Sequence, residues 1–135
     1  MHHSTFELLT ARLARRDGFT IERAGGGAGD LGADVIAVAP DGKTRVVIQC
    51  KHGTAKTTVG SPAIQRLNGT ARPVHRGDRV LAVTNGTYSI PAFKFASSQS
   101  IDLVARPILE RWATWGTPLS EILKLDDKEN ARNAA

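Results

Sequence analysis

The chain has 135 residues, of which 41% are hydrophobic and 23% charged. This balance excludes a wholly disordered or fibrous protein and fits one compact domain. No stretch approaches the roughly 18 uninterrupted apolar residues of a membrane span, and no apolar run followed by a cleavage site marks a secretory signal. Cys50 is the single cysteine, so an internal disulfide is excluded. We therefore expect a cytoplasmic protein without a membrane partner.

The excess positive charge is concentrated in the first part of the chain. The formal net charge is +5. Residues 1–79 contain 12 Lys or Arg and 7 Asp or Glu, whereas residues 80–135 contain 6 of each. Such a surplus favours a polyanionic partner, nucleic acid before an anionic membrane. Many soluble proteins are mildly basic, so charge alone does not identify the partner.

The first half of the sequence predicts one helix and three strands. Ser4 and Glu7 fit a capping box, apolar residues then recur at helical spacing, and Gly18 ends the helix. A strand is predicted over 19–24, followed by a glycine-rich loop. Two β-rich runs on either side of Asp41-Gly42 predict a hairpin of strands 34–39 and 45–51.

The second half predicts a strand–helix–strand crossover. Residues 52–60 have no periodicity and are expected to form a loop. Further on, the patterns predict helices over 61–72, 89–98, 107–115 and 119–125 and strands over 79–84 and 101–104. We expect one α/β domain over residues 1–125 with a mixed sheet of four to five strands flanked by helices, and a frayed tail over 126–135.

The predicted hairpin brings three polar side chains together. A two-residue turn at 41–42 places Asp34 directly opposite Gln49, and Lys51 shares that face because side chains alternate along a strand. A one-residue bulge would turn Asp34 to the other face. Carboxylate and amide oxygens suit Mg²⁺. The simpler alternative is a structural Asp34–Lys51 ion pair at a strand end, although the amide beside it would then be superfluous.

Several segments together resemble a known family. They are residues 29–36 (GDLGADVI), 47–51 (VIQCK), Phe6-Glu7, Val83-Thr84-Asn85-Gly86 and Ile101-Asp102-Leu103. In this order they resemble the catalytic core of the Mrr-type (type IV) restriction endonucleases, members of the PD-(D/E)XK nuclease superfamily in which Gln-x-Lys replaces the more common Glu-x-Lys. The resemblance covers roughly residues 5–110.

This resemblance implies a restriction-endonuclease-like fold with an αβββαβ core and a metal-dependent DNA endonuclease. The reaction would be phosphodiester hydrolysis with Mg²⁺, for which Mn²⁺ is expected to substitute, leaving a 5′-phosphate. By position, Asp34 would be the central metal ligand, with Gln49, Glu7 and the backbone carbonyl of Cys50 as further ligands. Lys51 would position or activate the attacking water.

Three alternatives remain open at this point. The same positions are similar to those of archaeal Holliday-junction resolvases, from which Gln49 departs. A nucleic-acid-binding module that retains the fold but has lost catalysis would also carry these motifs, with Gln49 as the sign of decay. Glu7 fits the capping box with Ser4 as well as it fits a metal site.

The remaining candidates surround this site. We expect DNA contacts from basic or polar residues near it, with Arg72 and Arg79 as further candidates: His52, Lys56, Arg66, Arg76, Thr84 and Asn85. Asp30 and Gln65 are candidate residues around the metal ligands. Cutting both strands of a duplex requires two active sites, so we expect a homodimer. A separate recognition subunit is a further candidate partner, because the chain has no room for a recognition domain.

Overall fold

A five-stranded mixed sheet forms the centre of the molecule, and its strand order is β1-β2-β3-β5-β7. The structure, a computed structural model, describes residues 3–24 and 34–125. The strands β1 (Thr20–Ala24), β2 (Val35–Val38) and β3 (Arg45–Lys51) pair antiparallel, whereas β3, β5 (Arg79–Thr84) and β7 (Ile101–Val104) pair parallel. The predicted class, a hairpin followed by a crossover, is confirmed.

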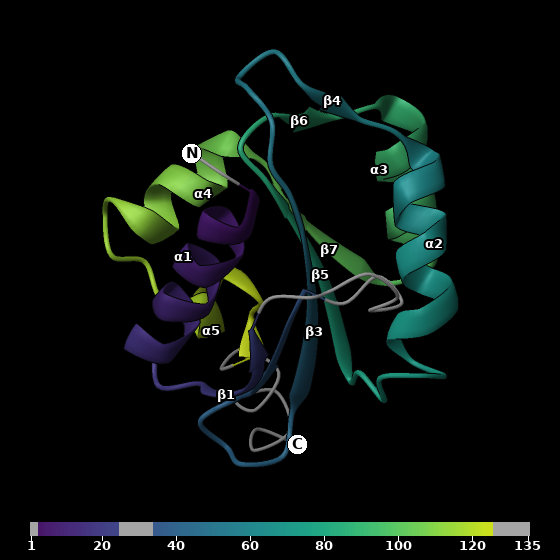
Figure 1. The fold of residues 1–135 in the computed structure, drawn as a ribbon. Helices are drawn as coiled ribbons and strands as arrows, with labels where there is room; N and C mark the ends of the chain where they lie inside the picture. The colour runs from purple at the N-terminus through teal and green to yellow at the C-terminus, as the bar shows by residue number, and fades with distance from the viewer. Residues whose placement is uncertain (1–2, 25–33, 126–135) are drawn as a thin grey trace.

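Helices cover both faces of the sheet (Figure 1). One face packs against α1 (His3–Arg16), α4 (Arg106–Ala113) and α5 (Leu119–Ile122), and the other against α2 (Ser61–Ala71) and α3 (Ile90–Ser98). A sheet covered on both faces needs apolar side chains on both, which explains the uninterrupted apolar runs of β3 and β5. None of the helices in residues 3–24 and 34–125 is long and apolar enough to cross a membrane.

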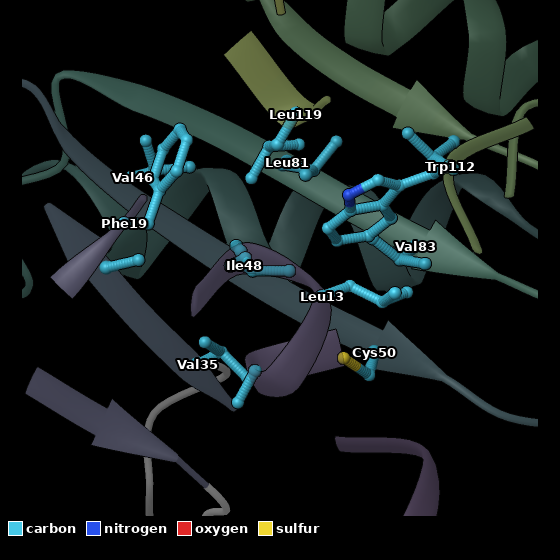
Figure 2. Packing of buried hydrophobic residues seen from close by; sticks show 14 of the residues in the cluster. Leu13, Phe19, Val35, Val46, Ile48, Cys50, Leu81, Val83, Trp112 and Leu119 are labelled. Carbon is cyan, nitrogen blue, oxygen red and sulfur yellow. The ribbon is translucent and has the colours of Figure 1, made fainter. Parts of the chain in front are cut away.

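The larger apolar cluster lies between the sheet and α1, α4 and α5 (Figure 2). Figure 2 shows side chains from neighbouring strands pointing into this layer, together with Cys50 at the end of β3. The contributors from the sheet and helices include Leu13, Phe19, Val35, Val46, Ile48, Leu81, Val83, Trp112 and Leu119. Alternate residues of the same strands, such as Val47 and Val80, belong to the cluster beneath α2 and α3.

A buried carboxylate fixes α4 and α5 to the end of α1. Asp17 Oδ2 accepts hydrogen bonds from Trp112 Nε1 at 2.7 Å and from the backbone N–H of Leu119 at 2.8 Å. Trp112 is fully buried and is therefore a core residue, whereas Trp115 is 79% exposed. Gly18 follows with a φ of 91°, the left-handed conformation that ends a helix.

The hairpin register is the predicted one, although the turn is not. Val35 pairs with Ile48 and Val38 with Arg45, as predicted. The N–H of Asp34 also donates to the carbonyl of Ile48 at 3.0 Å, so the paired register ends at Val35 and does not extend to an Asp34–Gln49 pair. The prediction of a two-residue turn at 41–42 was wrong: the N–H of Ala39 donates to the carbonyl of Thr44 at 2.8 Å, so the loop spans residues 40–43. Two-residue and four-residue loops about the same centre keep the same register, so the longer loop does not change which residues face each other.

The hairpin loop depends on Asp41. Its carboxylate accepts hydrogen bonds from the backbone N–H groups of Lys43 and Thr44 and from the Thr44 hydroxyl. The hydroxyl first and then the two N–H groups hold the pKa of Asp41 below its usual 3.8. We expect Asp41→Ala to lower the free energy of unfolding by up to about 1 kcal/mol at pH 7.

A depressed pKa stabilises the folded state above pH 3.8 and loses this contribution as the pH falls through the folded-state pKa. The difference between wild type and Asp41→Ala should therefore shrink below pH 3.8. Urea titrations at several pH values measure it. A difference that grows in acid would contradict the role given to the carboxylate.

A second, smaller sheet corrects the prediction for residues 52–60. Residues 52–60 were expected to form a loop, but β4 (Thr58–Val59) lies there and pairs parallel with β6 (Thr87–Tyr88). Strands of two residues are too short to produce a visible alternation in the sequence. The first helix spans His3–Arg16. The predicted tail, 126–135, lies outside the described residues.

Candidate active site

Gln49 and Lys51 lie at the carboxyl end of β3, beside the end of β5. In the parallel register Gln49 pairs with Ala82 and Lys51 with Thr84. Open α/β sheets bind ligands at this edge, because the strands end there and side chains of several elements converge. The chain continues from this edge towards β4 and β6, at the top of Figure 1.

Asp34 reaches the same edge from the start of β2. Its N–H donates to the carbonyl of Ile48 at 3.0 Å, and its Oδ2 accepts from the N–H of Cys50 at 2.8 Å. Because β2 begins only at Val35, the Asp34 carboxylate takes the place of a backbone acceptor for Cys50. Asp34 is 7% exposed. The carboxylate is thereby held at the strand end.

The backbone carbonyl of Cys50 is directed to the same side. In an extended strand the N–H and the C=O of one residue point towards the same neighbouring strand. The N–H of Cys50 points towards Asp34, and so does its carbonyl. The sequence resemblance implied this carbonyl as a ligand, and its direction is compatible with that role.

The side-chain oxygen of Gln49 is buried without a hydrogen-bond partner among the described residues. Burying an amide oxygen in this way costs about 1–3 kcal/mol, so it indicates a missing partner. Within the described ranges no group of three or more His, Cys, Asp or Glu side chains is placed to hold a metal ion. A metal site here would therefore depend on the Gln49 oxygen and a backbone carbonyl in addition to the carboxylates.

Glu7 is 3% exposed on the inner side of α1. Burial, above all, raises the pKa of the Cys50 thiol to about 12, with further contributions from the charges of Asp34 and Glu7. Both carboxylates thus lie close to one thiol, although Glu7 and Asp34 come from different segments of the predicted motif set.

The buried thiol provides a test of this arrangement. With a pKa of about 12 in the folded state, on the order of one thiol in ten thousand is ionised at pH 8, against about a tenth near the ordinary value of 9.0. We expect Cys50 to react with Ellman's reagent at least about 100-fold more slowly in the native protein than in urea. Rapid native reaction would show that the site end of the fold opens.

The Lys51 side chain is partly exposed and makes no ion pair with any described residue. The alternative of a structural Asp34–Lys51 ion pair is therefore not what the structure contains. The backbone of Lys51 is held by Thr84, whose Oγ1 donates to the Lys51 carbonyl at 2.7 Å. An ammonium group that no described carboxylate neutralises, placed at a ligand-binding edge, is available to a phosphate.

Three of the predicted DNA contacts lie on the accessible surface outside the strands. The imidazole of His52 packs on the ring of Phe6, with centroids 5.5 Å apart, and remains partly exposed. Lys56 is exposed in the loop after β3, and Arg66 is exposed on α2. Gln65 is also exposed on α2, where its amide donates to Ser61 Oγ at 2.6 Å. Asp30 lies outside the described residues.

The basic residues that follow α2 are at the wrong end of the sheet. The carbonyl of His75, next to Arg76, accepts from Arg45 Nε at 2.7 Å. Arg45 begins β3, six residues or about 20 Å from Lys51. Arg79 pairs there with Asp102 at 2.8 Å. The structure therefore does not bring Arg76 to the site, and the same holds for Arg79 and for Arg72, which contacts the end of α3.

Thr84 and Asn85 are at the site, but their polar groups are occupied. Thr84 is fully buried. The amide of Asn85 accepts from the N–H of Gly53 at 2.9 Å and donates to its carbonyl at 2.7 Å. Gly53 and Gly86, which complete this end of the fold, were not among the predicted site residues. The sequence does contain an indication of them, because a glycine follows each of two strands that end at the same edge of the sheet.

The buried Gln49 oxygen leads to a test that needs no substrate. Gln49→Met keeps the side-chain length and removes the oxygen. Without divalent metal, we expect this variant to gain about 1 kcal/mol in free energy of unfolding. With Mg²⁺, only the wild type should gain stability. Thermal melts with and without Mg²⁺ measure both effects, and Gln99→Met on the exposed end of α3 is the control.

Comparison with known proteins gives the family and the fold of the chain. The mixed sheet, its helices and the polar strand end define a restriction-endonuclease-like fold. A family model described as restriction endonuclease, Mrr_cat, matches residues 1–113. The chain belongs to this family. No curated protein matches it.

Solved structures support the fold assignment. AF1548, a protein of unknown function, matches with a TM-score of 0.62 at 22% identity over 94% of this chain and 66% of its own. The MspJI restriction endonuclease in complex with a 27-mer oligonucleotide matches with 0.55 at 23% identity, over 89% and 31%. A repair endonuclease from Pyrococcus abyssi matches with 0.52 at 15% identity, over 78% and 47%. The chain thus spans between about a third and two thirds of these proteins.

Proposed function

We propose that the protein is a divalent-metal-dependent DNA endonuclease that hydrolyses phosphodiester bonds at the Asp34–Gln49–Lys51 edge of the sheet. The observation that carries this proposal is the Gln49 oxygen, buried without a partner among the described residues. It belongs to the strand end at which the Asp34 carboxylate accepts from the N–H of Cys50. Membership of the restriction endonuclease family supports the reaction class.

The donor set fits Mg²⁺. Asp34 and Glu7 supply carboxylate oxygens, and Gln49 and the carbonyl of Cys50 supply neutral ones. A cation of this kind takes hard oxygen ligands and retains several waters. When bound, it would supply Lewis acidity towards the phosphate and lower the pKa of water. Mn²⁺, which accepts the same ligands, is expected to substitute.

Lys51 performs the protein's own part of the reaction. Its ammonium donates hydrogen bonds to the attacking water or to a phosphate oxygen and so stabilises the negative charge that develops in the transition state. Asp34 and Gln49 would hold the ion at the end of β3. Thr84 holds the Lys51 backbone in place through the carbonyl.

The DNA backbone runs across the same edge in this proposal. Lys56, His52 and Arg66 contact phosphates, whereas Thr84 and Asn85 are assigned to the support of the edge. The similar MspJI restriction endonuclease is in complex with an oligonucleotide, which supports DNA as the ligand class. Two copies of the chain would cut the two strands of a duplex, so a homodimer completes the proposal.

Plasmid cleavage tests the proposal. Purified protein is incubated with supercoiled plasmid, linear duplex and a synthetic four-way junction, each with Mg²⁺, Mn²⁺ or EDTA. We expect nicked and linear plasmid with either metal and none with EDTA. Cleavage confined to the junction would favour the resolvase alternative, and DNA binding without any cleavage would favour the inactive module. A strand-break end that carries a 5′-phosphate is the expected product.

A further inference from the structure

Thr84 and Asn85 make three hydrogen bonds to the chain that leaves β3. Thr84 Oγ1 donates to the carbonyl of Lys51 at 2.7 Å. The Asn85 amide accepts from the N–H of Gly53 at 2.9 Å and donates to its carbonyl at 2.7 Å. Adjacent residues at the end of β5 therefore fix the backbone on both sides of His52.

The loop 53–57 packs closely against the residues that follow β5. The N–H of Thr54 donates to Thr57 Oγ1 at 2.8 Å, and the carbonyl of Thr57 accepts from the N–H of Thr87 at 2.9 Å. A Cβ at Gly86 would lie 2.3 Å from the Thr57 carbonyl oxygen, and one at Gly53 would lie 2.2 Å from Thr57 Oγ1. Only glycine at both positions allows this packing, so the loop has one defined shape.

The polar groups of the two supporting residues are bonded to the protein itself. Thr84 is fully buried, and both ends of the Asn85 amide are bonded to Gly53. By contrast, the middle of the loop is exposed and includes Lys56. Any effect of Thr84 or Asn85 on DNA must therefore act through the groups that they hold.

We propose that Thr84 and Asn85 are positioning residues with separate effects: Thr84 places Lys51 for cleavage, and Asn85 fixes the loop 53–57 so that Lys56 meets the DNA backbone. This inference rests on the proposed nuclease function. It assigns two adjacent residues to two different steps, chemistry and binding, because Thr84 is bonded to Lys51 and Asn85 is bonded to Gly53.

The Thr84 half is tested with Thr84→Val and Thr84→Ser. Valine keeps the shape and removes the hydroxyl, so kcat should fall about tenfold or more, since small displacements of a catalytic group are costly. The Kd for duplex, measured with Ca²⁺ in place of Mg²⁺, should stay within about twofold of the wild type, because Lys56 is still presented. Serine retains the donor and should restore kcat. Thr70→Val, on the distant end of α2, is the control.

The Asn85 half is tested with Asn85→Ala. The Kd for duplex should rise about five- to tenfold with kcat at saturating DNA little changed, and the Gly53 amide should exchange with solvent faster. Lys56→Ala should raise Kd similarly, and the double variant should add little because both act through one contact. Asn68→Ala removes an exposed amide on α2 that donates to Gln99, and it is the control.

Three results would overturn the inference. They are equal impairment of Thr84→Val and Thr84→Ser, an unchanged Kd in Asn85→Ala, and additive effects of Asn85→Ala and Lys56→Ala. If the wild type does not cleave DNA at all, the proposed function fails by itself. The Thr84 half then fails with it, whereas the exchange rate of Gly53 and the duplex Kd still decide the positioning role of Asn85 without any cleavage assay.

Discussion

Asp34→Asn should reduce metal-dependent cleavage of plasmid DNA by at least about 10³-fold while leaving the fold intact. The asparagine retains an oxygen that can accept the Cys50 N–H, which Asp34 accepts at 2.8 Å. It loses the negative charge that a divalent cation requires. The expected result is therefore loss of activity with an unchanged melting temperature in EDTA, measured by plasmid nicking and thermal denaturation.

The sheet offers a matched control for this substitution. Asp78 Oδ2 accepts from the backbone N–H of Arg45 at 2.8 Å, the same kind of contact at the opposite end of β3. Asp78→Asn should leave cleavage unchanged. Asp34→Ala, unlike the asparagine variant, leaves the buried Cys50 N–H without an acceptor and should also lose about 1–3 kcal/mol of stability. Full activity in Asp34→Asn would remove this carboxylate from the site.

The register of the hairpin could be predicted because it depends on few variables. Strands 34–39 and 45–51 flank one turn, and the pairing between them depends only on the centre of that turn. Any loop centred on 41–42 pairs Val35 with Ile48, whatever its length. The actual loop is longer than predicted, with Asp41 supplying acceptors for its N–H groups. A local error in the turn therefore did not alter the register from Val35 to Val38, whereas Asp34, whose N–H donates to the carbonyl of Ile48, lies beyond the paired residues.

The basic residues were harder to place because a charge has no periodicity. Arg76 and Lys56 are equally polar in the sequence, yet one follows α2 at the start of the parallel strands and the other follows β3 at their end. Direction along the sheet, rather than composition, decides which of them can approach Lys51. The end of the sheet at which each residue lies follows from the strand–helix–strand connection, and not from the residue's own charge.

The support of the site was not visible in the sequence for a different reason. Thr84 and Asn85 have the polarity of ligand-binding residues, and strand ends are where ligands bind. Only the hydrogen bonds to Lys51 and Gly53 reveal that their polar groups are occupied by the protein itself. Whether a polar group already has a hydrogen-bond partner depends on tertiary contacts, and these cannot be inferred from one residue at a time.

Lys51→Met should lower the rate of phosphodiester cleavage by about 10²- to 10³-fold with a change in DNA Kd of no more than about threefold. Methionine retains the apolar part of the side chain, and Lys51 has no ion pair with a described residue to lose. Stability should therefore remain within about 0.5 kcal/mol of the wild type. Single-turnover cleavage and duplex binding with Ca²⁺ separate the two effects.

Lys43→Met in the exposed hairpin loop is the matched control, because it removes the same charge at the far end of β3. Equal losses in both variants would show that net charge, not the position of Lys51, determines the rate. Unchanged cleavage in Lys51→Met would require another donor for the developing negative charge. Loss of DNA binding together with cleavage would instead make Lys51 a phosphate anchor, since a group that acts only in the transition state leaves the ground-state Kd unaffected.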